Sequence, residues 1–114
     1  MNRPRRNQEQ KLQEQAINTL RLYENTGRLF VFAVPNGERR DAVTGAKLKR
    51  SGVRAGVSDI VVVMTSRVVF IELKTKTGKQ SREQRIFEER IRSFGFEYYV
   101  CRSISEILAC LDLA

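Results

Sequence analysis

Residues 60–73 read IVVVMTSRVVFIEL, two runs of mostly β-branched and aromatic residues separated by Thr65-Ser66. Each run is too short for a typical helix and has the composition of a strand. The two-residue separation predicts a tight antiparallel hairpin over residues 58–74. This hairpin decides the fold, because its turn fixes which residues on the two strands meet.

A symmetric turn between Thr65 and Ser66 places Asp59 directly opposite Glu72, and directly opposite side chains share a face. Side chains alternate along a strand, so Lys74 is expected on the same face as Glu72. Two carboxylates and a lysine are the groups needed to hold a divalent metal ion and cut a phosphodiester. The prediction depends on the register, because a slip of one residue would move Asp59 to the other face.

Hydrophobic spacing, capping residues and turn residues predict the other elements. The strand–helix–strand sequence that follows the turn is a βαβ unit, so the last strand should run parallel to the strand that holds Glu72. Ser103 and Glu106 are expected to form a capping box at the last helix. The order αβ(α)ββαβα predicts one α/β domain over residues 1–114, with a mixed sheet covered by helices and a basic tail over residues 1–7. The expected elements are helix 8–24, strand 28–35, a short helix 41–51, the hairpin 58–74, helix 81–94, strand 96–101 and helix 104–112.

The chain is strongly basic, with 21 Lys and Arg against 13 Asp and Glu and a net charge of +8. A small domain of this charge is matched to a polyanion such as nucleic acid, although a merely solvated basic surface is the simpler alternative. The cations flank the acidic residues of the hairpin, as delivery of a phosphate backbone to a metal would require. The candidate nucleic-acid-binding residues are Arg39, Arg40, Lys47, Lys49, Arg50, Arg54, Lys76 and Lys79.

Several kinds of protein are excluded by what the chain lacks. No histidine occurs, which removes histidine metal sites and Ser-His-Asp triads. Cys101 and Cys110 do not have the spacing of metal ligands and are expected to be reduced thiols. No apolar run is long enough for a membrane helix, and the basic start lacks the apolar region of a secretory signal. We therefore expect a protein of the cytoplasm, in a bacterial or phage-infected cell.

The ordered set of motifs resembles the virus-type replication-repair nuclease (VRR-NUC) family of the PD-(D/E)xK nuclease superfamily, over nearly the whole chain. The resemblance implies a restriction-endonuclease-like fold. One departure is visible, since the proline that usually precedes the aspartate is Ser58 here. The matching residues are Glu9 and Gln13, then Pro35-Asn36-Gly37, Gly52 to Asp59, Glu72-Leu73-Lys74, Gln84, and Ser103 with Glu106.

Carried over to this sequence, the resemblance implies that Asp59 and Glu72 bind Mg²⁺ or Mn²⁺, together with the backbone carbonyl of Leu73. Ligands made only of oxygen suit these hard cations. Glu9 would add a carboxylate from the first helix. Glu14 competes for that role, but the spacing of Glu9 from the following glutamine favours Glu9.

The resemblance also implies roles for Lys74 and Gln84. Lys74 would position or help to deprotonate the attacking water, and a cationic Lys74 that stabilises the phosphate is equally compatible. Gln84 would support the site. It also stands three residues after Ser81, where a capping-box glutamine belongs, and both roles can hold together.

These residues together predict a metal-dependent, structure-selective DNA endonuclease. Small members of the family resemble junction-resolving enzymes of phage and bacteria, and symmetric cutting of a Holliday junction needs the two-fold symmetry of a homodimer. Two alternatives stay open. One is a catalytically silent, basic nucleic-acid-binding module, and the other is an RNA-directed nuclease with the same fold.

Overall fold

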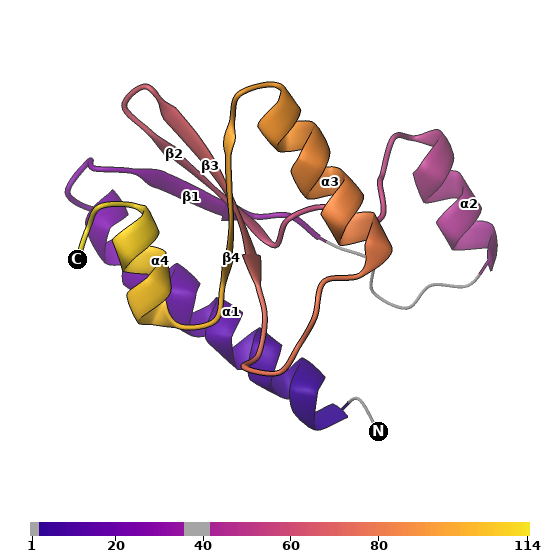
Figure 1. Ribbon diagram of the computed structural model, residues 1–114, viewed down its shortest axis with the longest axis horizontal. Helices are drawn as coiled ribbons and strands as arrows, with labels where there is room; N and C mark the ends of the chain where they lie inside the picture. Colours follow the sequence, from indigo (N-terminus) through magenta and orange to yellow (C-terminus); the bar gives the residue numbers. More distant parts are fainter. Residues whose placement is uncertain (1–2, 36–41) are drawn as a thin grey trace.

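The computed structural model describes residues 3–35 and 42–114, which form a mixed α/β unit (Figure 1). The order of its elements is the order predicted from the sequence, and the α/β fold class is confirmed. The bounds are α1 Arg3–Glu24, β1 Phe30–Ala33, α2 Ala42–Arg50, β2 Ile60–Met64, β3 Arg67–Leu73, α3 Arg82–Ser93, β4 Glu97–Cys101 and α4 Ile104–Cys110.

The strands of the described residues form one sheet in the order β1-β2-β3-β4. β2 is antiparallel to both β1 and β3, whereas β4 runs parallel to β3, as the predicted βαβ unit requires. The hairpin has the predicted register, since Met64 pairs with Arg67 and Ile60 pairs with Ile71. Ser66 in the turn has a φ of 59°, in the left-handed region that tight hairpin turns use.

The ladder between β2 and β3 ends one pair earlier than predicted. Its last pair is Ile60 with Ile71, and the N–H of Asp59 also bonds to the carbonyl of Ile71, at 3.1 Å. Two residues therefore lie opposite one, as in a β-bulge. The carbonyl of Asp59 accepts a bond of 2.9 Å from the N–H of Val34, so Asp59 is attached to both neighbouring chain segments. The expectation that Asp59 stands directly opposite Glu72 in the ladder is wrong for this reason.

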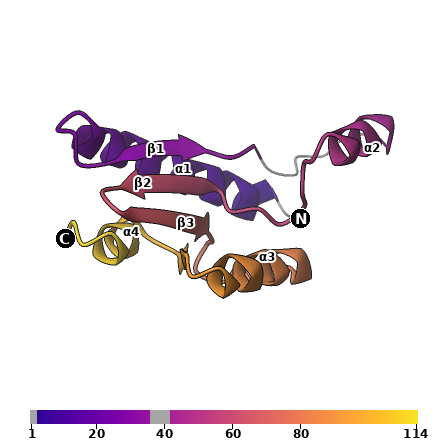
Figure 2. The same ribbon diagram turned by 90° about the horizontal axis from the view of Figure 1, so that it is seen from above.

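The two faces of the sheet have different covers. One face packs against α1 and α4 and forms the hydrophobic core. The other face carries Phe70 and Tyr98 and packs against α3, where the ring of Phe87 lies 6.2 Å from that of Phe70 and 6.0 Å from that of Tyr98. Figure 2 shows α1 and α3 on opposite sides of the sheet. The buried core residues are Ala16, Leu20, Leu29, Val31, Ile60, Val62, Val69, Ile71, Leu73, Cys101, Ile107 and Leu111.

The helix ends show where local sequence signals succeed and fail. α1 begins at Arg3, so residues 3–7 of the expected tail are helical. The second capping box is half formed, because Ser103 accepts from the N–H of Glu106 at 3.1 Å while the Glu106 carboxylate accepts from the N–H of Arg102 at 2.6 Å. In the described part of the chain, no helix has the length and apolarity that a membrane crossing requires.

Arg67 ties the turn end of the sheet together. Its guanidinium donates two hydrogen bonds to the Glu97 carboxylate, at 2.8 and 2.7 Å, and it also contacts Asp112 at 3.0 Å. These bonds link the start of β3 to the start of β4 and to the chain after α4. The hydrogen bonds from Arg67 hold the pKa of Glu97 below its usual value.

Candidate active site

Glu72 is the centre of the candidate active site, on the sheet face that α3 covers. The side chain is fully buried. Its Oε1 atom accepts hydrogen bonds from the hydroxyl of Tyr98 at 2.7 Å and from Nε2 of Gln80 at 3.0 Å. Its Oε2 atom is also buried and has no hydrogen-bond partner among the described residues. Because a buried carboxylate oxygen without a donor is costly, Oε2 marks a place where a cation is expected.

Lys74 faces this oxygen. Its Nζ lies 3.5 Å from Oε2 of Glu72, and only 8% of the residue is exposed. The backbone continues the line of β3, because the N–H of Lys74 bonds to the carbonyl of Cys101 at 3.0 Å. The predicted proximity of Glu72 and Lys74 on one face is therefore confirmed.

Asp59 reaches the same end of β3 by a different route from the one predicted. Its Oδ2 atom accepts a hydrogen bond of 2.6 Å from the backbone N–H of Leu73. The carboxylate is thus attached to the residue between Glu72 and Lys74. Although the ladder stops before it, Asp59 lies beside the Glu72-Leu73-Lys74 stretch, and its half-buried side chain is accessible to solvent.

Glu9 approaches the site from α1 across Gly78. A Cβ atom added at Gly78 would lie 3.4 Å from Oε2 of Glu9 and 3.5 Å from Cδ of Lys74, so both side chains lie close to this glycine. Glu14, the competing candidate, is exposed and accepts a hydrogen bond from Gln10 on the same helix. The placement therefore favours Glu9 over Glu14.

Gln84 serves as the capping residue of α3. Its Oε1 accepts from the N–H of Ser81 at 2.8 Å, and the hydroxyl of Ser81 accepts from the N–H of Gln84 at 3.1 Å. This confirms the capping-box interpretation. The glutamine that reaches Glu72 is Gln80, which sequence reasoning missed because it lies in a loop whose path no local pattern predicts.

Tyr98 is the other residue that sequence reasoning missed at the site. Its ring is fully buried. Its hydroxyl reaches Glu72 because Tyr98 pairs with Phe70 in the parallel ladder, two pairs before Glu72 with Val100, so Phe70 and Glu72 share one face of β3. Burial, followed by the hydrogen bond to Glu72, raises the pKa of Tyr98, so the hydroxyl remains a donor.

The donor set fits a hard divalent cation. Asp59 and Glu72 offer carboxylates, and the backbone of Leu73 bonds to Asp59 and follows Glu72 in the chain. Oε2 of Glu72 has an ion pair with Lys74 but no hydrogen-bond donor among the described residues. Oxygen ligands of this kind suit Mg²⁺ or Mn²⁺. Over the described ranges, no three Asp, Glu, His or Cys side chains are grouped closely enough to hold one ion. Glu9 is therefore not gathered with Asp59 and Glu72 into a three-carboxylate cluster.

The predicted nucleic-acid-binding residues fall into two described groups. Lys47, Lys49 and Arg50 lie on α2, with Arg54 in the following loop, and all four are exposed. Figures 1 and 2 both show α2 set apart from the sheet.

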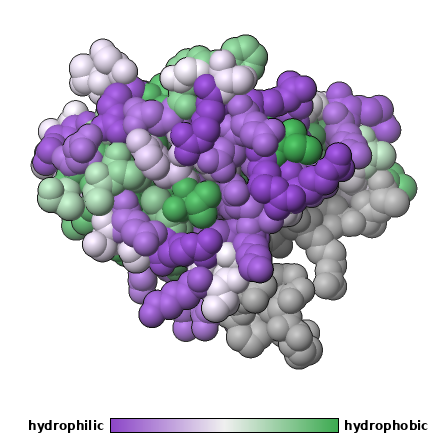
Figure 3. Space-filling model, in the orientation of Figure 1, coloured by the Kyte–Doolittle hydropathy of each residue, from purple (hydrophilic) through white to green (hydrophobic). Residues whose placement is uncertain are grey.

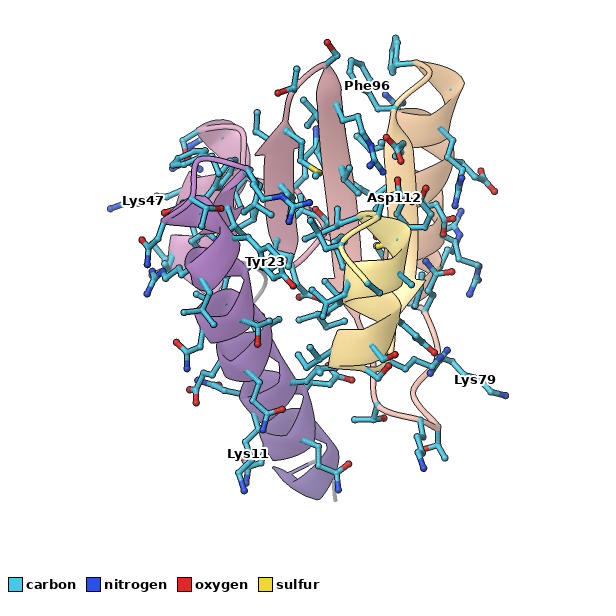
Figure 4. All side chains as sticks on the ribbon, turned by 90° about the vertical axis from the view of Figure 1, so that its left-hand side faces the viewer. Lys11, Tyr23, Lys47, Lys79, Phe96 and Asp112 are labelled. Atoms are coloured by element: carbon cyan, nitrogen blue, oxygen red, sulfur yellow. The ribbon has the colours of Figure 1, made fainter. Side chains whose placement is uncertain are left out.

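The second group consists of Lys76 and Lys79, which are exposed in the loop after β3. Figure 4 shows Lys79 projecting at one end of the sheet, with Phe96 at the other end. The face seen in Figure 3 is largely hydrophilic, with its hydrophobic residues in separate patches. Arg39 and Arg40 lie outside the described residues.

Comparisons with known proteins show the family and the fold of this chain. The family model of the VRR-NUC domain matches residues 4–105. A solved structure described as a VRR_NUC domain protein superposes with a TM-score of 0.58 at 20% sequence identity. The match covers 73% of this chain and 64% of that one, and at this identity it shows the fold alone. No curated protein sequence matches significantly. VRR-NUC domains are nuclease domains of the PD-(D/E)xK type, and because the family model spans most of the sequence, this chain belongs to the VRR-NUC domain family.

Proposed function

We propose that the domain is a divalent-metal-dependent endonuclease that hydrolyses phosphodiester bonds in branched DNA, in the manner of a Holliday-junction resolvase. The observation that carries this proposal is the buried Oε2 of Glu72, which has no hydrogen-bond donor and faces the ammonium of Lys74 at 3.5 Å. Oε2 has an ion pair with Lys74 but no hydrogen bond from the described residues, so its lone pairs are available to a bound cation. If the substrate is the DNA of a bacterial or phage-infected cell, the enzyme would act in the cytoplasm.

Asp59 and Glu72 would hold the cation, with the carbonyl of Leu73 as a third oxygen. The bound ion would lower the pKa of a water molecule and neutralise charge on the phosphate. Lys74 lies against Glu72, where it would position or help to deprotonate the attacking water, or stabilise the developing negative charge as a cation. Glu9 would add a carboxylate from α1 on the side of the site where Gly78 lies.

The nucleic-acid substrate is supported by charge. The exposed cations of α2 and the following loop, and those of the loop after β3, offer contacts to phosphates on more than one segment of a strand. We propose that the residues predicted from the sequence, Lys47, Lys49, Arg50, Arg54, Lys76 and Lys79, bind the DNA backbone. Gln84 would support the site indirectly, because its capping box with Ser81 holds the first turn of α3.

A homodimer would supply the two symmetric cuts that resolve a four-way junction. An apolar strip on the sheet supports self-association. Phe30 and Phe32 are 55% and 43% exposed with ring centroids 5.8 Å apart, and Phe30 pairs with Val63. Val63 and Phe96 line one groove of about 410 Å³ at the turn end of the sheet. Apolar surface gathered in this way is typical of protein–protein contacts.

The test is cleavage of three labelled substrates by the purified chain. These are a four-way junction, a linear DNA duplex with the sequence of one arm, and an RNA duplex, each with Mg²⁺, Mn²⁺ or EDTA. We expect paired, symmetric cuts on the junction in Mg²⁺ or Mn²⁺ and none in EDTA.

Two results would replace the proposal by its alternatives. Tight binding of the junction without cutting in either metal would indicate a silent nucleic-acid-binding module. Cutting of RNA but not of DNA would indicate an RNA-directed nuclease.

A further inference from the structure

The two hydrogen bonds on Glu72 are both made to the same oxygen. Tyr98 and Gln80 donate to Oε1, at 2.7 and 3.0 Å, and Oε2 receives none from the described residues. A glutamate side chain has a loosely defined terminal torsion. Two donors on one oxygen fix that torsion and decide which oxygen remains for a cation.

Tyr98 is itself held rigidly. The residue is fully buried, its ring packs 6.0 Å from that of Phe87, and its backbone carbonyl accepts a hydrogen bond of 2.6 Å from Arg92. A rigid phenol presents its hydroxyl at a fixed point, and it cannot act as a cation that would compete with a metal ion. Tyr98 is therefore suited to orient Glu72 rather than to neutralise it.

Gln80 connects the same oxygen to α3. Its Nε2 donates to Oε1 of Glu88 at 2.8 Å as well as to Glu72, and Glu88 accepts a hydrogen bond of 2.8 Å from Arg92. Arg92 thus holds Glu88 and the carbonyl of Tyr98 together. The two donors to Glu72 are braced by one arginine, so they form a single support for the carboxylate.

We propose that Tyr98 and Gln80 are positioning residues, which hold Oε1 of Glu72 so that Oε2 is presented to the divalent cation. The inference rests on the proposed function, since it requires that Glu72 binds a metal ion. Partners of metal-binding carboxylates typically change metal affinity about 10- to 100-fold when they are removed.

Tyr98→Phe is the direct test, and Tyr99→Phe is its matched control. Tyr99 is the next residue on β4, and its hydroxyl also donates to a carboxylate, that of Glu97 at 2.9 Å. Mn²⁺ binding is measured by titration calorimetry on the whole chain without DNA. We expect Tyr98→Phe to weaken Mn²⁺ binding about tenfold or more and Tyr99→Phe to leave it unchanged. Cleavage by Tyr98→Phe should recover as Mn²⁺ is raised, which a general loss of structure would not allow.

Gln80→Met removes the other donor at similar volume, and it keeps the inference testable if Tyr98→Phe does not fold. We expect it also to weaken Mn²⁺ binding. If folded Tyr98→Phe and folded Gln80→Met both bind Mn²⁺ with the wild-type affinity, the inference is overturned. The proposed function would still stand in that case, provided that the wild type shows metal-dependent cleavage. Failure of the wild type to bind Mn²⁺ would overturn the proposed function and this inference together.

Discussion

The carboxylate of Asp59 accepts a 2.6 Å hydrogen bond from the backbone N–H of Leu73. This bond attaches the residue before β2 to the end of β3, beyond the last ladder pair of the hairpin. It brings Asp59 beside Glu72 and Lys74 without a regular cross-strand pair. The candidate site therefore depends on a side chain-to-backbone bond at the edge of the hairpin as much as on the hairpin itself.

Glu9 is expected to affect catalysis and Glu14 is not. Glu9 and Lys74 both lie close to Gly78, whereas Glu14 is exposed and accepts a hydrogen bond from Gln10. We expect Glu9→Gln to lower the cleavage rate about tenfold through the loss of a negative charge near the proposed metal site. Glu14→Gln, an identical change five residues along the same helix, should cleave at the wild-type rate. Equal rates for the two variants would remove Glu9 from the site.

Gly56 is expected to be intolerant of any side chain. It has a φ of +80°, and an added Cβ would lie 2.4 Å from the carbonyl carbon and 2.5 Å from the carbonyl oxygen of Glu83. Gly95→Ala is the matched control, because Gly95 has a φ of +87° with nothing within 4 Å. Both changes incur backbone strain of about 1–2 kcal/mol, and Gly56→Ala adds overpacking of about 1–3 kcal/mol.

Chemical denaturation measures this difference between the two glycine variants. Gly56→Ala should have the lower free energy of unfolding, and it should also lose cleavage, since Gly56 lies in the segment that leads to Asp59. Equal destabilisation by the two substitutions would show that the loop before β2 does not pack against the first turn of α3.

Glu97 is expected to make stability depend on pH. Arg67 lowers the pKa of Glu97 in the folded protein, so the stabilisation is present above the unfolded pKa of about 4.3 and is lost as pH falls through the lower folded pKa. We expect Glu97→Gln to cost about 1–2 kcal/mol at pH 7, a figure reduced for partial exposure. The gap from wild type should shrink below pH 4 in urea unfolding curves. A gap that is constant with pH would argue against the charged pair.

The basic groups are expected to set the salt dependence of DNA binding. Each phosphate contact contributes about −0.9 to the slope of log affinity against log salt. We expect the double variant Lys49→Ala with Arg54→Ala to weaken binding and to make the slope shallower by about 2. Arg21→Ala is the control, because it lies twelve residues along α1 from Glu9, about 18 Å at 1.5 Å per residue. If the salt slope changed equally in the double variant and in Arg21→Ala, DNA binding would not be localised to the basic residues of α2 and the following loop.

Local signals predicted much of this fold. β-branched composition and a two-residue spacing are enough to give the hairpin and its pairing of Ile60 with Ile71, and Ser81 with Gln84 gave the capping box. Each of these features depends on neighbours in sequence. The proximity of Glu72 and Lys74 followed for the same reason, because alternation along one strand needs no knowledge of the rest of the chain.

Features that depend on distant segments were not predictable in this way. The ladder ends at a bulge in which the N–H of Asp59 bonds to the carbonyl of Ile71, while the carbonyl of Asp59 accepts from Val34, the residue after β1. The hydroxyl of Tyr98 reaches Glu72 through the parallel register of β4, and a βαβ connection leaves that register undetermined by sequence pattern. Gln80 reaches the site through a loop path, which only the assembled structure defines.

The most direct test of the metal-dependent nuclease is the rate of junction cleavage by the wild type and by Glu72→Gln, in Mg²⁺ and in EDTA. Gln keeps the size of Glu and an oxygen for Tyr98, but it removes the negative charge that would hold the cation. The account predicts cleavage by the wild type in Mg²⁺ only, and a rate at least about 100-fold lower for folded Glu72→Gln. Cleavage by Glu72→Gln at the wild-type rate, or wild-type cleavage that persists in EDTA, would contradict it.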